Sequence, residues 1–65
     1  MTPDEVLCQL KKHYECKINP YDKSSIVIYN VSFKQVSNLC EKYRCSGSYN
    51  EELSIGIILN FGLYK

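Results

Sequence analysis

The chain has 65 residues, with eight basic and seven acidic side chains and a net charge of +1. We expect one small domain over residues 1–65, because a chain of this length buries only a modest share of its surface. The near-zero charge, without a long block of like charges, argues against a mainly electrostatic grip on nucleic acid or on an anionic membrane. No apolar run is long enough to cross a membrane and no secretory leader is evident, so a cytoplasmic location is expected.

The residue usage carries a bias of its own. Lys, Ile, Asn and Tyr are abundant, whereas Ala and Trp are missing from the sequence. Such usage is expected of an AT-rich coding sequence, which predicts a low-GC bacterium, or one of its phages or plasmids, as the source.

The first half of the chain predicts a helix followed by two strands. Thr2, Pro3 and Glu5 form a capping box with proline at the first helical position, so a helix is expected over about residues 3–15. Its apolar face is predicted to carry Val6, Leu7, Leu10 and Tyr14. A short strand over residues 16–18, a turn-rich connection over 19–23 and a strand over 24–30 follow.

The same order restarts at Ser32, which forms a second capping box with Gln35. A helix ending near Arg44 is expected, and its apolar face is predicted to carry Phe33, Val36, Leu39, Cys40 and Tyr43. Residues 45–49 read as a strand, 50–52 as a tight turn and 53–61 as the longest strand.

These elements predict an α+β fold of the order αββαββ. We expect two layers, with a four-stranded antiparallel sheet and both helices on one of its faces. The two αββ units span residues 2–31 and 32–61, and Leu10, Tyr14 and Cys16 match Leu39, Tyr43 and Cys45 at one constant offset. Two interpretations stay open: a tandem duplication, or two amphipathic units that obey the same burial rules.

Both faces of the two long strands carry apolar residues. We expect Ile28 and Ile57 to join Leu10 and Leu39 at the centre of the core, because they alternate on the strand faces assigned to the helix side. The opposite face would then expose Val27, Tyr29 and Ile58. Either these are ordinary surface residues or they form an interface for a partner or a second copy.

Tyrosine is frequent, and Tyr21 and Tyr49 fall at or beside the two predicted hairpin turns. Exposed tyrosines are common anchors in protein interfaces, so both join the predicted partner-binding set. They also stack on bases. The alternative function is therefore a small nucleic-acid-binding regulator that uses exposed tyrosines together with the basic side chains Lys17, Lys23, Lys34, Lys42 and Arg44.

The four cysteines, Cys8, Cys16, Cys40 and Cys45, lack the paired spacing of a structural zinc site. We expect free thiols and no metal; a Cys16–Cys45 disulfide is the remaining possibility, opposed by a reducing cytosol. His13 is expected near the end of the first helix, where a positive charge is favoured. No catalytic or phosphate-binding motif occurs, so neither an enzyme nor a cofactor is predicted.

The sequence thus predicts a non-enzymatic, intracellular interaction module. It is a candidate regulator or inhibitor encoded by a phage or other mobile element, acting through its open sheet face on a protein partner or as a homodimer. No small-molecule substrate is inferred.

Overall fold

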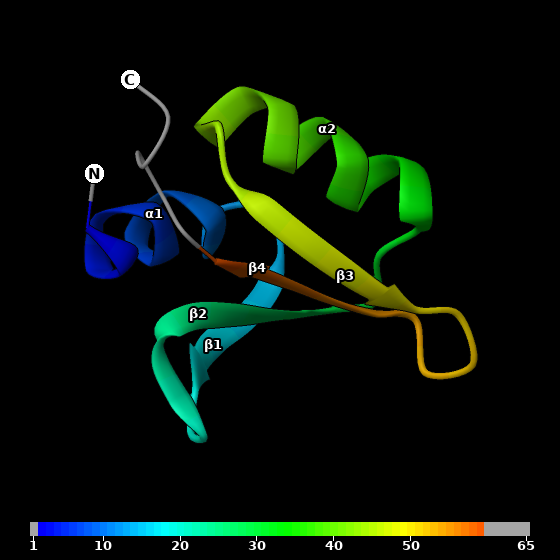
Figure 1. Ribbon diagram of the computed structural model, residues 1–65, viewed down its shortest axis with the longest axis horizontal. Helices are drawn as coiled ribbons and strands as arrows, with labels where there is room; N and C mark the ends of the chain where they lie inside the picture. The colour runs from blue at the N-terminus through cyan, green and yellow to red at the C-terminus, as the bar shows by residue number, and fades with distance from the viewer. Residues whose placement is uncertain (1, 60–65) are drawn as a thin grey trace.

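The computed structural model describes residues 2–59 and consists of two helices and four strands (Figure 1). In chain order these are α1 (Pro3–Leu10), β1 (Glu15–Asn19), β2 (Asp22–Tyr29), α2 (Phe33–Tyr43), β3 (Ser46–Asn50) and β4 (Ile55–Leu59). This confirms the predicted αββαββ order and the α+β class.

The four strands form one antiparallel sheet in the order β1-β2-β4-β3. β2 and β4 are therefore the central strands, and β1 and β3 are the edges. Both helices lie on the same side of the sheet, with α1 near β1 and β2 and with α2 near β3 and β4 (Figure 1). The two predicted layers are confirmed, and within residues 2–59 no helix covers the other face of the sheet.

α1 begins at Pro3 as predicted, with only the Thr2 half of the predicted capping box formed, and it ends early. The Thr2 hydroxyl accepts a hydrogen bond from the backbone N–H of Glu5 at 3.3 Å, and Pro3 occupies the first turn. The expected extension to Glu15 is wrong, because the chain leaves the helix after Leu10 and turns toward β1. The N–H groups of His13 and Tyr14 both donate to the Leu10 carbonyl in this turn, at 3.0 and 2.8 Å.

α2 carries the complete predicted capping box. Ser32 Oγ accepts from the N–H of Gln35 at 3.2 Å, and Gln35 Oε1 accepts from the N–H of Ser32 at 2.8 Å. Val36, Leu39 and Tyr43 are buried as expected. Phe33 was predicted on the same apolar face, but it is 69% exposed in the first turn of α2, where its ring meets the Tyr49 ring edge-on.

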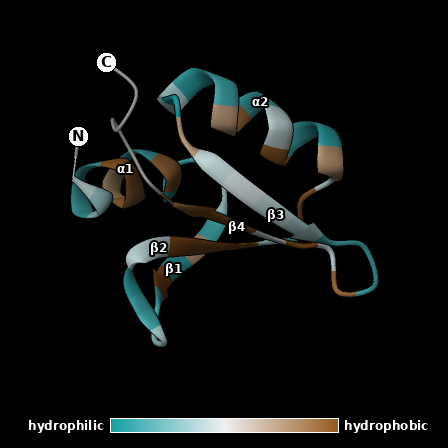
Figure 2. Ribbon diagram, in the orientation of Figure 1, coloured by the Kyte–Doolittle hydropathy of each residue, from teal (hydrophilic) through white to brown (hydrophobic). Residues whose placement is uncertain are grey.

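The core fills the space between the helices and the central strands. Figure 2 shows the strongest hydrophobicity on β2 and β4, whereas the edge strand β3 is pale. Val6, Ile26, Ile28 and Ile58 have no exposed surface, and Leu10 and Leu39 are also buried. Within residues 2–59, every buried side-chain nitrogen or oxygen has a hydrogen-bond partner.

The predicted assignment of β4 residues to the two faces is wrong. Ile58 pairs with Ile26 and is fully buried beneath the helices, whereas Ile57 pairs with Val27 on the opposite face and is half-buried. The inner positions of β4 are thus Gly56 and Ile58. A Cβ added at Gly56 would collide with Cγ2 of Val36, so glycine is required where α2 crosses close to the strand.

β4 also starts later than predicted. Residues 51–54 form a turn in which Ser54 adopts a positive φ of 54° and the Asn50 side chain accepts from the N–H of Leu53 at 3.2 Å. Leu53, expected in the strand, is therefore an exposed turn residue. The predicted positions Asn60 and Phe61 of this strand lie outside the described residues.

The two αββ units occupy related positions in the sheet. Ile28 of the first unit and Ile58 of the second are both fully buried on the helix side of the sheet, so these two positions correspond. The constant sequence offset had instead matched Ile28 with Ile57. The αββ order therefore occurs twice in the structure. In the central strands, however, the corresponding residues lie one position further apart in the sequence than the constant offset predicts.

Candidate interaction surface

The sheet face that carries no helix is formed mainly by apolar side chains of the central strands. We call it the open face and define it by five residues, all from β2 and β4: Val27, Tyr29, Ile55, Ile57 and Leu59. Register fixes this assignment, because cross-strand partners share a face and Val27 pairs with Ile57. Tyr29 and the three β4 side chains are half-buried, and Val27, seated between its neighbours, is 9% exposed.

The two edges of the open face differ in chemistry. On β1, Glu15 is the partner of Tyr29, and Lys17 is the partner of Val27. The Lys17 ammonium lies 5.9 Å from the centre of the Tyr29 ring, which makes a cation–π contact across the face. On β3 the corresponding edge is uncharged and consists of Ser46, Ser48 and Asn50.

A shallow hollow continues the open face at the start of β4 and the end of β3. It has a volume of about 420 Å³ and is lined by Ser48, Tyr49, Asn50, Leu53, Ile55 and Ile57. Leu53 is 64% exposed beside it. The sequence prediction missed Ile55, Ile57 and Leu59 as surface residues because β4 is apolar on both faces, so alternation alone does not fix which side is inward. It missed Leu53 because residue 53 was predicted in the strand, whereas it lies in the turn over residues 51–54.

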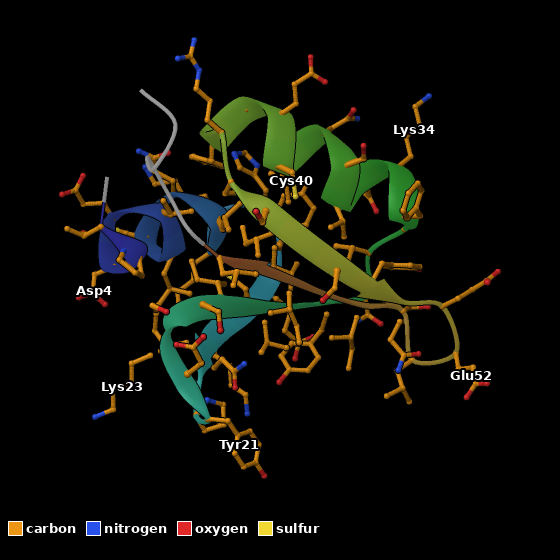
Figure 3. The ribbon with its side chains drawn as sticks, viewed as in Figure 1. Asp4, Tyr21, Lys23, Lys34, Cys40 and Glu52 are labelled. Atoms are coloured by element: carbon orange, nitrogen blue, oxygen red, sulfur yellow. The ribbon has the colours of Figure 1, made fainter. Side chains whose placement is uncertain are left out.

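The five predicted partner-binding residues are not brought together. Val27 and Tyr29 lie on the open face, whereas Ile58 lies on the opposite side, in the core. Tyr21 is 96% exposed at the tip of the β1–β2 hairpin and points away from the helices (Figure 3). Tyr49 is half-buried on the helix side, where its hydroxyl donates to the Val31 carbonyl at 2.7 Å and its ring meets Phe33 edge-on, with centroids 6.1 Å apart.

The basic residues predicted for nucleic-acid binding are dispersed. Lys17 borders the open face on β1, and Lys23 belongs to the β1–β2 hairpin. Lys34 lies in the first turn of α2, at the far end of the molecule from Lys23 (Figure 3), and Lys42 and Arg44 lie at the other end of that helix. These five side chains do not form one basic patch.

A second concave surface separates the helices. This groove has a volume of about 650 Å³ and is lined by Gln9, Leu10, Lys12, His13, Tyr14, Gln35, Asn38, Leu39, Lys42 and Tyr43. His13 was expected near the end of the first helix, but it lies in the turn after α1, because the helix ends at Leu10. Its lining combines exposed polar and charged side chains with the buried side chains Leu10, Leu39 and Tyr43.

The cysteines are free thiols in the structure. Cys16 is buried on the helix side of β1, and burial raises its pKa, partly offset by the positive charge of Lys11. Cys8 is exposed on α1, and Cys40 and Cys45 are half-buried at the end of α2. Among residues 2–59, no three histidine, cysteine or acidic side chains are placed to share a metal ion.

Comparison with known proteins gives no relative: no protein-family model, curated protein or solved structure matches the chain. Neither of the two described helices has the length and apolar character needed to cross a membrane.

Proposed function

We propose that this chain is a small, non-catalytic protein-interaction module that binds through its open face, and that the occupant of this face is a second copy of the chain. The observation that carries the proposal is the row of apolar side chains on both central strands, over which the described part of the chain, residues 2–59, places no helix. In a two-layer protein such a face stays in contact with water unless another molecule covers it.

The edge charges favour a second copy. On β1, Glu15 and Lys17 are two residues apart on the open face. Consider a twofold axis that lies between the two stacked sheets, runs across the strands and passes between these two positions. It places Glu15 of one copy over Lys17 of the other, and Lys17 over Glu15. The same operation places Tyr29 over Val27 and Ile55 over Ile57, so apolar side chains meet apolar side chains.

The dimer should be weak. Four strands spaced about 4.8 Å apart, with five residues rising about 3.3 Å each, give a face of roughly 19 by 17 Å. Two such faces together bury roughly 650 Å², which is below the roughly 1,200 Å² at which stable specific interfaces begin and falls among weak, transient contacts. We therefore expect dissociation in the micromolar range or weaker, which suits a regulator that exchanges partners.

The wider role we propose is a cytoplasmic regulator or inhibitor from a phage or another mobile element of a low-GC bacterium. The residue usage supports the source, and four unpaired thiols fit a reducing compartment. The alternative of nucleic-acid binding has less support, because the basic residues are dispersed over the hairpin, the open-face edge and both ends of α2.

The experiment is sedimentation of the wild type and two matched lysine variants. Ile57→Lys places a charge at the centre of the open face, and Phe33→Lys places one at an exposed apolar position on the helix side. The wild type and Phe33→Lys should show a mass that rises with concentration toward two copies. Ile57→Lys should stay monomeric, because burying an unpaired charge in an apolar contact is costly.

Two results would contradict the proposal. One is a wild type that remains monomeric at millimolar concentration. The other is a folded Ile57→Lys variant, as judged by circular dichroism, that associates as the wild type does. Steep, salt-sensitive retention of the wild type on a heparin column would instead favour the nucleic-acid alternative.

A further inference from the structure

The end of α2 brings two cysteines together. Arg44 adopts the left-handed conformation, with φ 52° and ψ 54°, and the N–H of Cys45 donates to the Cys40 carbonyl at 2.9 Å. This is the hydrogen bond of a Schellman motif, in which the side chains of the two bonded residues commonly contact each other. Here both side chains are thiols, so the cap that ends the helix also places the Cys40 thiol next to the Cys45 thiol.

The two thiols have different surroundings. Cys40 faces β3 from the underside of α2 (Figure 3), and its Sγ lies 2.5 Å from where a Cβ would stand on Gly47. Cys40 also lines a hollow of about 240 Å³ that opens to solvent beside Phe33, Ser37 and Tyr49. Cys45 Sγ instead turns inward and lies 4.0 Å from the Leu39 carbonyl oxygen.

The two thiols also differ in their expected reactivity. Burial raises the pKa of Cys45 to about 12, and the neighbouring Cys40 contributes through its charge and a hydrogen bond. Because the thiolate is the nucleophile in disulfide exchange, Cys45 is a poor first attacker. Cys40 is the sulfur that an incoming reagent reaches through the hollow.

We propose that Cys40 and Cys45 form an oxidative modification site, at which a low-molecular-weight disulfide such as glutathione disulfide converts the two thiols into an intramolecular disulfide. The Cys40 thiolate attacks one sulfur of the reagent, forms a mixed disulfide and releases one reagent thiolate. Cys45 then loses its proton to solvent and attacks Cys40 Sγ, which breaks the mixed bond and releases the second reagent thiolate. Two protein thiols are oxidised, and one reagent disulfide is reduced to two thiols.

Trypsin mapping tests this pairing directly, because Lys42 and Arg44 lie between the two cysteines. The wild-type chain is treated with glutathione disulfide, remaining thiols are blocked with iodoacetamide, and the digest is analysed by mass spectrometry. We expect residues 35–42 and 45–65 to be recovered as one linked species that separates on reduction. The linked species should be two hydrogen atoms lighter than the sum of the two reduced peptides and should carry no glutathione.

Two serine variants test the order of attack, with Cys8→Ser as the matched control for an exposed thiol. Cys45→Ser should accumulate a glutathione adduct on Cys40, because the resolving thiol is missing. In Cys40→Ser, neither glutathione disulfide nor iodoacetamide should modify Cys45 while the protein is folded. Cys8→Ser should form the same linked peptides as the wild type.

Three results would overturn the proposal. The first is a linked species joining residues 13–17 to 45–65, which would mean that Cys16 pairs with Cys45. The second is a wild type in which residues 35–42 and 45–65 stay unlinked after prolonged treatment. The third is faster modification of Cys45 than of Cys40 in folded protein.

Discussion

The hydroxyl of Tyr43 donates a hydrogen bond to Oε1 of Gln9 at 2.9 Å, which joins the end of α2 to α1 across the groove between the helices. The Tyr43 ring is buried, so its hydroxyl has little access to water when the bond is lost. The bond connects the two αββ units on the helix side, in addition to the pairing of β2 with β4 in the sheet.

Tyr43→Phe should therefore lower the free energy of unfolding by about 1 kcal/mol, the usual net worth of a partly buried hydrogen bond. Urea denaturation followed by circular dichroism measures the change. Gln9→Ala should cost a similar amount, and the double variant should cost less than the sum of the two single variants. Strict additivity would mean that the two side chains do not interact.

The neighbouring residues Ile57 and Ile58 provide a matched pair for the assignment of β4 faces. Ile58→Ala should destabilise the chain by roughly 2 to 5 kcal/mol, because it leaves a cavity in the core. Ile57→Ala should cost distinctly less, since Ile57 is half-buried on the open face. Equal losses in a thermal or urea melt, or a larger loss at Ile57, would contradict the register described above.

Gly56 should tolerate no side chain. Gly56→Ala drives a methyl group into Val36, and overpacking of this kind costs about 1 to 3 kcal/mol. Adding Val36→Ala to this variant should cost less than Val36→Ala costs in the wild type, because the new methyl group fills part of the space. A Gly56→Ala variant as stable as the wild type would show that α2 does not approach β4 this closely.

The sequence predicts the wrong β4 residues on the helix side of the sheet, and the reason is physical. Residues 55, 57 and 59 are all large and apolar, so simple alternation assigned them to the core. The core side instead holds Gly56 and Ile58, because α2 passes so close that one inner position has no room for a side chain. Glycine inside a strand often marks such close approach, and this was the signal available in the sequence.

The helix starts were predictable because capping uses local hydrogen bonds between residues three apart, as at Ser32 and Gln35. The helix end after Leu10 was not, since it depends on where the chain must descend to pair β1 with β2. The pairing of Cys40 with Cys45 was not predictable either, because it depends on the left-handed conformation of Arg44. Residues other than glycine seldom adopt this conformation, so an arginine in the sequence does not indicate it.

Asp22 gives a prediction about pH. Its carboxylate accepts hydrogen bonds from the hydroxyl and the backbone N–H of Ser24, at 2.6 and 3.0 Å, and these bonds hold the pKa of Asp22 below its ordinary value. A lowered pKa means that the contribution to stability is present at neutral pH and is lost as the pH falls through the acidic range below about 4. Titration followed by NMR should show the lowered pKa. Ser24→Ala should move the pKa upward, and an unchanged value would contradict this account.

The central claim is that two copies pair through the open face with Glu15 over Lys17. Its most direct measurement is sedimentation equilibrium, at low ionic strength, of the charge-reversal variants Glu15→Lys and Lys17→Glu, each alone and mixed in equal amounts. Each variant alone faces two like-charge contacts, so its dimer should weaken by on the order of tenfold. The mixture should associate at least as well as the wild type, because every contact is then between opposite charges. Variants that dimerise alone as the wild type does, or a mixture that remains monomeric, would contradict the proposed dimer.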